Sequence, residues 1–229
     1  MSGQAAMRVV VTAAGSDLGQ QLLRAIAARG SLRRGGGAPQ AIDRILAVDH
    51  AQPAALFIDE RVEYVRGDYE QPRFLSRMMG AACDSVFHLA PRYAALGAGP
   101  GADGLELALA RSVQVTQSLI DACRLLSCAP RFVYAGLRGL RSTPGAVPQD
   151  MGAVCVDVCE SVLFEAARRG IVSLCSVRLP SAAGQAPSAA ELEAAARALL
   201  DAHDLEAPNA MPRIVEAEVS GRLRACTDA

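Results

Sequence analysis

The sequence predicts an α/β protein built on a doubly wound parallel sheet, and two observations carry this prediction. Short runs of β-branched and other apolar residues, bounded by turn residues, recur along the chain. Segments with the apolar period of an amphipathic helix lie between these runs. Continuously apolar strands that alternate with helices are typical of a parallel sheet covered by helices on both faces.

The expected elements follow one another in a regular order. We expect strands at residues 8–12, 44–49, 62–66, 85–89, 132–135 and 172–178. We expect helices between them at residues 18–29, 72–79, 105–127 and 153–169. Right-handed crossovers then give the strand order 3-2-1-4-5-6, with a ligand crevice at the carboxyl ends of the first and fourth strands. The Gly- and Arg-rich segment 31–40 is expected to be a mobile loop.

The character of the sequence changes after Pro180. Ser188, with Glu191 three residues later, has the pattern of a capping box before an Ala/Leu-rich helix. One more strand is expected around residues 213–219. We therefore predict a main domain over residues 1–180, followed by a short helical and strand appendage over residues 181–229.

Composition and charge exclude several classes of protein. The 229 residues are 51% apolar with a formal net charge of −1, so no basic field predicts nucleic-acid binding. No apolar run approaches the roughly 18 to 20 residues of a membrane helix, and the first residues lack a signal-peptide pattern, so we expect a cytoplasmic protein. The seven cysteines form no CxxC pair, which favours reduced core cysteines and no metal site. The chain contains no lysine, because all 23 basic residues are arginine.

Seven segments carry a resemblance to a known family. They are VVVTAAGSDLG at 9–19, ILAVD at 45–49, VEYVRGDYE at 62–70, DSVFHLAP at 84–91, RFVYAG at 131–136, ESVLFEAARRG at 160–170 and VRLP at 177–180. In this order they resemble the extended short-chain dehydrogenase/reductase family, within it the NAD-dependent epimerase/dehydratase group and its D-erythronate dehydrogenase-like branch. The resemblance implies a Rossmann-type NAD(P)-binding domain over residues 1–180 and a reduced substrate-binding part after it.

The glycine turn of the family departs from its usual pattern here. The positions of TGxxGxxG fall on Ala13, Ser16 and Gly19, so only the third glycine is in register, and Gly15 lies one residue early. A Cβ atom at the first two positions opposes a positive φ or a close approach to phosphate. The Ser16 hydroxyl and the helix N-terminus near Leu18 would compensate in part. We therefore expect NAD binding that is weakened or lost.

The resemblance also implies contacts at other strand ends. Asp49 ends the second strand, where the family acid binds the ribose hydroxyls and favours NAD over NADP; the alternative is that it only caps a turn. Asp68 corresponds to the acid beside the adenine, whereas His88 is expected to be a packed core residue. The implied cofactor-binding residues are Ala13, Gly15, Ser16, Asp17, Leu18, Gly19, Asp49, Asp68, Tyr69, Leu89 and Ala90.

The catalytic residues of the family are missing. The family uses a tyrosine as acid/base and a lysine four residues later, and these positions fall on Gly152 and Val156, or on Met151 and Cys155 after a one-residue slip. Its Ser or Thr falls at residues 135–136, which are Ala and Gly. A phenol with a pKa near 10 exchanges protons at neutral pH only beside a cation that stabilises the phenolate. The sequence therefore predicts that the standard catalysis is lost.

Three hypotheses about function remain open at this point. The leading one is a degenerate family member, a pseudoenzyme that binds NAD weakly and serves as a partner or regulatory subunit. The alternative is an active NAD-dependent oxidoreductase or epimerase for a small hydroxy acid or sugar-derived substrate, with a rearranged site that uses Tyr134, or Tyr93, and an arginine such as Arg138. The third is a decayed or truncated gene product without a selected function.

Two helices suggest a dimer. Val154, Val158 and Val162 form a stripe beside a second apolar stripe that contains Cys155 and Cys159, which is too broad for a helix that touches only a sheet. The matching helices of the family pair across a two-fold axis, so helices 105–127 and 153–169 imply a homodimer or a heterodimer. The alternative is that the second stripe packs within the domain.

Overall fold

The computed structural model describes residues 6–33, 37–50, 56–67, 72–80, 82–89, 102–137, 151–180, 187–205 and 212–225. The strands are β1 (Met7–Thr12), β2 (Ser31–Arg33), β3 (Pro39–Asp49), β4 (Val62–Arg66), β5 (Ser85–Leu89), β6 (Arg131–Leu137), β7 (Ser173–Leu179), β8 (Arg213–Ala217) and β9 (Leu223–Ala225). The helices are α1 (Asp17–Arg29), α2 (Pro72–Met79), α3 (Ala102–Cys123), α4 (Met151–Arg168) and α5 (Ala189–Asp204).

The order of the strands confirms the predicted topology. The parallel strands lie in the order β4-β3-β1-β5-β6-β7, which is the predicted order 3-2-1-4-5-6, and β8 continues the sheet in parallel beside β7. The last strand, β9, pairs antiparallel with β8. Because β1 lies between β3 and β5, the connections leave it toward opposite sides of the sheet. The topological switch point, where such sheets bind ligands, is therefore at the carboxyl ends of β1 and β5.

The sequence predicts a mobile loop at residues 31–40, whereas residues 31–33 and 39–40 belong to strands. Gly30 takes a left-handed φ of 66° and ends α1, which turns the chain directly into β2. Strand β2 then pairs antiparallel with the beginning of β3, which starts at Pro39 instead of residue 44. The described residues of this segment thus form a hairpin at the edge of the sheet.

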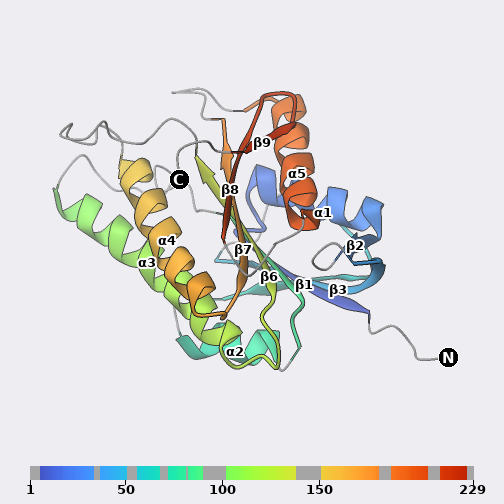
Figure 1. Cartoon of the computed structure of the whole chain (residues 1–229), viewed down its shortest axis with the longest axis horizontal. Helices are drawn as coiled ribbons and strands as arrows, with labels where there is room; N and C mark the ends of the chain where they lie inside the picture. Colours follow the sequence, from blue (N-terminus) through green and yellow to red (C-terminus); the bar gives the residue numbers. More distant parts are fainter. Residues whose placement is uncertain are drawn as a thin grey trace.

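Helices cover the sheet in two layers (Figure 1). Helices α1 and α5 pack on one face, and α2, α3 and α4 pack on the other. The side chains of β1 alternate accordingly, because Val9 and Val11 face α1 and α5 whereas Val10 faces the other layer. Burial on both faces is the reason that the strands are apolar without interruption.

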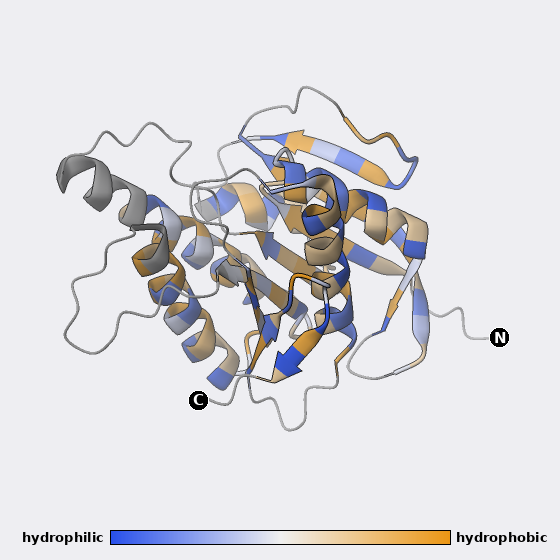
Figure 2. Ribbon diagram, turned by 90° about the horizontal axis from the view of Figure 1, so that it is seen from above, coloured by the Kyte–Doolittle hydropathy of each residue, from blue (hydrophilic) through white to orange (hydrophobic). Residues whose placement is uncertain are grey.

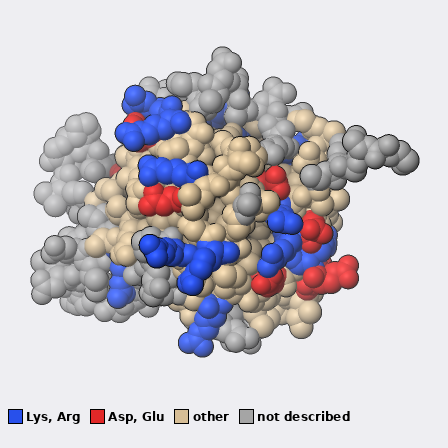
Figure 3. All heavy atoms as spheres, turned by 90° about the horizontal axis from the view of Figure 1, so that it is seen from below, with Lys and Arg blue, Asp and Glu red and all other residues tan. Residues whose placement is uncertain are grey.

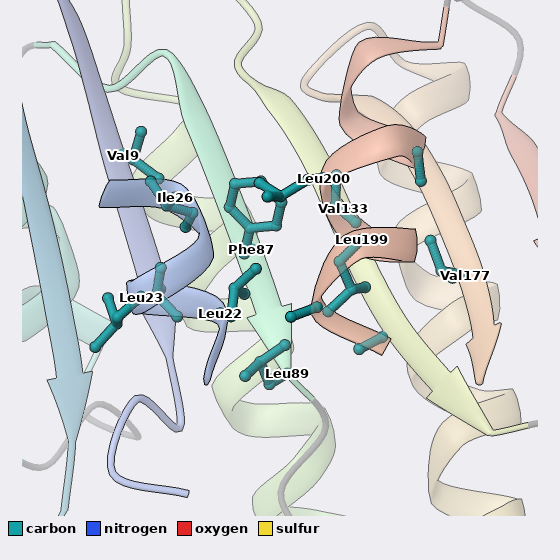
Figure 4. Close-up of a cluster of buried hydrophobic side chains, with 14 of the residues drawn as sticks. Val9, Leu22, Leu23, Ile26, Phe87, Leu89, Val133, Val177, Leu199 and Leu200 are labelled. Carbon is teal, nitrogen blue, oxygen red and sulfur yellow. The ribbon is translucent and has the colours of Figure 1, made fainter. Parts of the chain in front are cut away.

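The core on the α1 and α5 side is drawn in Figure 4, where Leu22 and Ile26 of α1 and Leu199 of α5 lie over Phe87 and Val133 of the sheet. Figure 2 shows hydrophilic and hydrophobic residues alternating along the helices. This pattern is expected for helices that bury one side and expose the other.

The helix ends follow the sequence signals closely. The capping box is confirmed, since the Ser188 side chain accepts from the Glu191 amide and the Glu191 side chain accepts from the Ser188 amide. Helix α3 ends at Cys123, four residues before the expected end, because the chain tightens into turns in which Leu125 N donates to Ala122 O.

The domain boundary that the sequence predicts at residue 180 stays a prediction. Helix α5 packs on α1, and β8 joins the same sheet as the strands before it.

The structure can also be compared with the classes of protein that the composition excludes. No helix in the described ranges is long and apolar enough to cross a membrane. Over the same ranges, no cluster of His, Cys, Asp and Glu is suited to a metal ion.

Arginine and carboxylate side chains lie among one another on the face shown in Figure 3, and surface ion pairs join Arg169 to Glu165 and Arg124 to Asp121. The described cysteines are free, and all of them except Cys128 are buried, as expected.

Candidate cofactor site

The turn between β1 and α1 keeps the backbone shape that a glycine usually provides. Ala13 has a φ of 50°, in the left-handed region, and it is 8% exposed. The amide of Ser16 donates to Ala13 O at 3.1 Å, and the amide of Ala14 donates to Val48 O of β3 at 3.2 Å. A left-handed backbone costs an L-residue roughly 1–2 kcal/mol. The turn therefore retains its shape at an energetic cost instead of rearranging around Gly15.

Ser16 uses its hydroxyl inside the turn. It is the N-cap of α1, and its Oγ accepts from the Gly19 amide at 3.0 Å. The same hydroxyl donates to Ala13 O at 2.8 Å. The sequence suggested that the Ser16 hydroxyl donates to a phosphate of the cofactor. In the structure this hydroxyl already donates to the backbone.

Gly19 permits the close packing expected of the third family glycine. A Cβ atom placed there would lie 2.5 Å from Ala13 O and 2.7 Å from the Ala14 Cα. Both of these are backbone atoms, so they would yield only if α1 moved away from the turn. Any side chain at this position would separate the helix from β1.

The first turn of α1 presents an anion-binding edge. Among the described residues, none accepts a hydrogen bond from the amides of Asp17 or Leu18, which belong to the first turn. These amides and the positive end of the helix dipole favour an anion. The exposed Asp17 carboxylate lies in the same turn, where its charge stabilises the helix and opposes an incoming phosphate.

Asp49 joins the end of β3 to this turn. Its Oδ2 accepts from the amide of Gly15 at 2.7 Å. This bond realises the turn-capping role that the sequence left open, and it also fixes the carboxylate beside the glycine turn. The two roles are compatible, because a carboxylate has lone pairs for several donors.

Gln20 is a residue of the site region that sequence reasoning missed. Its Nε2 donates to Ala14 O at 2.8 Å, and its Oε1 accepts from the amide of Phe57 at 2.8 Å. The hydroxyl of Tyr64 donates to Phe57 O at 2.8 Å. Gln20 lies one turn before Leu23 on the buried side of α1. A polar residue at a buried helical position was the feature of the sequence that could have predicted its role.

Of the remaining residues that the sequence predicts to bind the cofactor, only Leu89 lies within the described ranges. Leu89 ends β5, is 3% exposed and packs in the core beneath α1 and α5 (Figure 4). Asp68, Tyr69 and Ala90 lie outside the described residues, as do Tyr93 and Arg138.

Of the two positions that correspond to the family lysine, Val156 makes an apolar contact with β6 and Cys155 is buried. Val156 of α4 is 5% exposed, and its Cγ1 would lie 3.2 Å from a Cβ atom on Gly136 of β6. Helix and strand therefore pack closely where the family pattern places its lysine and its Ser or Thr. A Cβ atom at residue 136 would require the Val156 side chain to shift by a few tenths of an ångström.

The expectation that Tyr134 lies near the crevice is wrong. Its side chain is 1% exposed and belongs to the core beneath α2, α3 and α4. Its ring centroid lies 5.5 Å from that of His88. Because residues alternate along β6, Tyr134 projects into this helix-covered face and has no access to substrate.

His88 is a core histidine, as expected. Its Nδ1 lies 2.8 Å from the Thr12 hydroxyl, and its Nε2 lies 3.2 Å from the Thr116 hydroxyl. Thr116 donates its own proton to Ser112 O, so it accepts from Nε2–H, and Nδ1 accepts from Thr12. Burial lowers the pKa of His88 to about 3, which keeps the ring neutral.

A buried ion pair joins α4 to β7 one helical turn beyond Val156. Arg178 donates to Glu160 Oε2 at 2.7 Å, and the Ser176 hydroxyl donates to Glu160 Oε1. The two charged side chains are only 9% and 6% exposed. The signal for this pair was an arginine inside an apolar strand, since buried charges in proteins are paired.

The fold and the turn together place the chain among the Rossmann-type α/β proteins. The fold is shared with UDP-glucuronic acid 4-epimerase from Bacillus cereus, solved in complex with NAD, at a TM-score of 0.66 and 16% identity over 96% of this chain and 80% of that one. It is also shared with a carbonyl reductase from Pseudomonas aeruginosa PAO1, solved with NADP, at a TM-score of 0.68 and 16% identity over 96% and 100% of the two chains.

One curated protein gives a more particular similarity. The chain is 30% identical over 184 residues to D-erythronate dehydrogenase from Cupriavidus necator, covering 76% of this chain and 55% of that protein. The chain thus spans about half the length of the curated relative that it matches. No family model matches the chain. The resemblance to the extended short-chain dehydrogenase/reductase family and its D-erythronate dehydrogenase-like branch is confirmed.

Proposed function

We propose that this chain binds NAD at the turn between β1 and α1, lacks the Tyr/Lys catalysis of the family, and acts as a partner or regulatory subunit. The observation that carries the proposal is that the chain contains no lysine, and that the buried side chain of Val156 packs against Gly136 at one of the two positions that correspond to the family lysine. The left-handed turn and the close approach at Gly19 support the retained binding site.

The residues of the turn fit the pyrophosphate and ribose of NAD. The amides of Asp17 and Leu18 would bind the pyrophosphate, and Asp49 would accept from the ribose hydroxyls. The other members of the proposed site are Ala13, Gly15, Ser16, Gly19, Asp68, Tyr69, Leu89 and Ala90. Bound NAD would supply a hydride acceptor, whereas this chain would lack the group that moves the accompanying proton.

Three features would make the binding weak. The Cβ atom of Ala13 takes space that glycine leaves open for the phosphate, and the Ser16 hydroxyl already donates within the turn. The Asp17 carboxylate would repel the pyrophosphate. Each feature lowers the affinity without blocking the site, so we expect a dissociation constant for NAD in about the millimolar range.

The choice between NAD and NADP tests the role of Asp49. We expect NAD to raise the melting temperature more than equimolar NADP, because a carboxylate repels the 2′-phosphate. The variant Asp49→Asn keeps an acceptor for the Gly15 amide and should narrow this difference. If NAD and NADP raise the melting temperature of the unaltered protein equally, Asp49 does not discriminate between the two cofactors.

A hydride-transfer assay tests the loss of catalysis. With NAD and D-erythronate, or another small hydroxy acid, we expect no NADH above the level of a protein-free control. The burial of Tyr134 argues against the alternative active site. Turnover that disappears in Tyr134→Phe, with the fold intact, would overturn the proposal and support that alternative.

We also propose that α3 and α4 form the interface of a homodimer or a heterodimer. Helices α3 and α4 pack against each other on the sheet, and Val154, Val158 and Val162 remain only half-buried. Cys155 and Cys159 are buried in the domain, so the two apolar stripes of α4 have different surroundings. The valine stripe is the surface offered to a second subunit.

A further inference from the structure

A second cluster of polar side chains lies at the opposite edge of the sheet, where β5 and β6 begin. Ser85 starts β5, and its Oγ lies 2.7 Å from Nε2 of His203 near the end of α5. Nδ1 of the same ring lies 3.2 Å from Oδ1 of Asp204. Arg131 starts β6, and its guanidinium donates to the carbonyls of Ala202, His203 and Leu205 at 2.9 to 3.0 Å. The cluster thus binds the end of α5 to the sheet.

Asp204 extends the cluster to a third part of the fold. Its Oδ2 accepts from the side chain of Arg29 of α1 at 2.6 Å. Its Oδ1 accepts from the amide of Arg33 of β2 at 3.1 Å. The last turn of α5 is therefore held by residues from α1, β2, β5 and β6, all distant in sequence.

Ser85, His203 and Asp204 have the hydrogen-bond order of a hydrolytic triad, but they cannot act as one. The side chains of Ser85 and His203 are fully buried. The His203 ring also stacks on Phe87, with centroids 5.4 Å apart and planes inclined by 23°. No substrate reaches the serine in this arrangement, so the role of the cluster is structural.

We infer that Ser85, Arg131, His203 and Asp204 form a latch that docks the end of α5 on the sheet, and that α5 is released together with β8 and β9, which follow it in the chain, when His203 gains a proton. The turn between β8 and β9 packs closely against α5, since a Cβ atom at Gly221 would lie 2.8 Å from Ala194 O, and this contact connects the two strands to the helix.

The charges around His203 explain the sensitivity to acid. Arg131 from β6 and Arg29 from α1 bring two positive charges, and Asp204 from α5 brings one negative charge. Strand β5 contributes the uncharged Ser85 and Phe87. A proton on the buried ring would add a third positive charge with no new carboxylate to balance it, and burying an unpaired charge is unfavourable.

The sign of the pH effect follows from this environment. Burial, the largest cause, and Arg131 lower the pKa of His203 below its ordinary 6.5, whereas Asp204 raises it without reversing the shift. The docked segment therefore holds His203 neutral, and the released segment binds the proton. Docking is at full strength above pH 6.5 and weakens as the pH falls below that value.

Hydrogen exchange resolved along the chain tests the latch. We expect the opening constant of amides in α5, β8 and β9, corrected for intrinsic exchange, to rise by up to about tenfold per pH unit between pH 6.5 and 5. Amides of β1 and β3 should remain more protected than the segment at pH 5, although the protonation of His88 lowers the stability of the core as well. In His203→Gln, which takes up no proton in this range, the pH dependence of the segment should disappear.

A second variant keeps the test decisive if His203→Gln does not fold. Ser85→Ala leaves the Nε2 of His203 without its partner, so the segment should open about tenfold more often at every pH while β1 and β3 are unaffected. Protection of α5 to β9 that equals that of the core at both pH values would overturn the inference. So would labelling of Ser85 by a fluorophosphonate at neutral pH, since that requires an accessible serine.

Discussion

Ala13 is the residue at which the departure from the family pattern has a direct physical consequence. Its left-handed φ of 50° is the conformation for which glycine is preferred. The rest of the turn, held by Ser16, Gly19 and Asp49, over-determines this shape and supports the strain. The turn therefore holds Ala13 in a backbone conformation that is unfavourable for alanine.

Replacing this alanine tests the strain. Ala13→Gly should raise the free energy of unfolding by about 0.5–1 kcal/mol, because the relief of backbone strain exceeds the entropy that glycine loses on folding. Ala14→Gly is the matched control, since Ala14 is fully buried without a positive φ and should become less stable. Urea denaturation measures both. Equal destabilisation of the two variants would show that Ala13 is unstrained.

His88 makes the stability of the whole core depend on pH. Its pKa is about 3 in the folded chain because of burial and returns to about 6.5 on unfolding. The stability is complete above pH 6.5 and should fall by up to roughly 1.4 kcal/mol per pH unit toward pH 3. Urea denaturation at pH 7, 6 and 5 measures this slope. His88→Gln should reduce this slope and leave the part that His203 contributes, and an unchanged slope would assign all of it to other groups.

The ion pair between Glu160 and Arg178 matters at the scale of elements, because it joins α4 to β7. Removing one partner leaves the other charge buried, which costs about 3–5 kcal/mol. We expect that loss for Arg178→Met and for Glu160→Gln alone. The double variant should be no less stable than either single one. Strictly additive losses in this double-mutant cycle would mean that the pair has no mutual stabilisation.

The elements themselves were largely predictable, and the exceptions have physical causes. The expected strand 85–89 is confirmed without change, because an apolar run of this short length is typical of a buried strand and too short for a helix. Strand β2 was missed, since SLRRGGG contains a short polar stretch and glycines that carry no periodic signal. It forms because Gly30 ends α1 in a left-handed conformation and aims the chain back along β3.

At the scale of the whole molecule, the sequence predicts the topology but not the polar networks. Alternating strands and helices with right-handed crossovers leave few arrangements of the sheet. The contacts of Ser85 with His203 and of Gly15 with Asp49 join residues 118 and 34 positions apart. No local pattern encodes such pairs. The sequence analysis expected Tyr134 near the crevice because it located the strand without assigning a face to each residue, whereas the side chain is buried under α2, α3 and α4.

The association state is a second property of the whole molecule. We expect light scattering to show a dimer that Val158→Asp converts to a monomer, since the substitution puts a charge into the proposed valine stripe. Ala28→Asp on the exposed side of α1, in the other helix layer, is the control and should remain dimeric. A monomeric unaltered protein would exclude the homodimer and leave the heterodimer to be sought.

Calorimetric titration with NAD tests the central claim most directly. The account predicts saturable one-site binding with a dissociation constant in about the millimolar range, tighter for Ala13→Gly and weaker for Asp49→Ala. It also predicts that no NADH forms when a hydroxy acid is added to the titrated sample. The absence of any binding heat at millimolar NAD, from protein shown to be folded, would contradict the account.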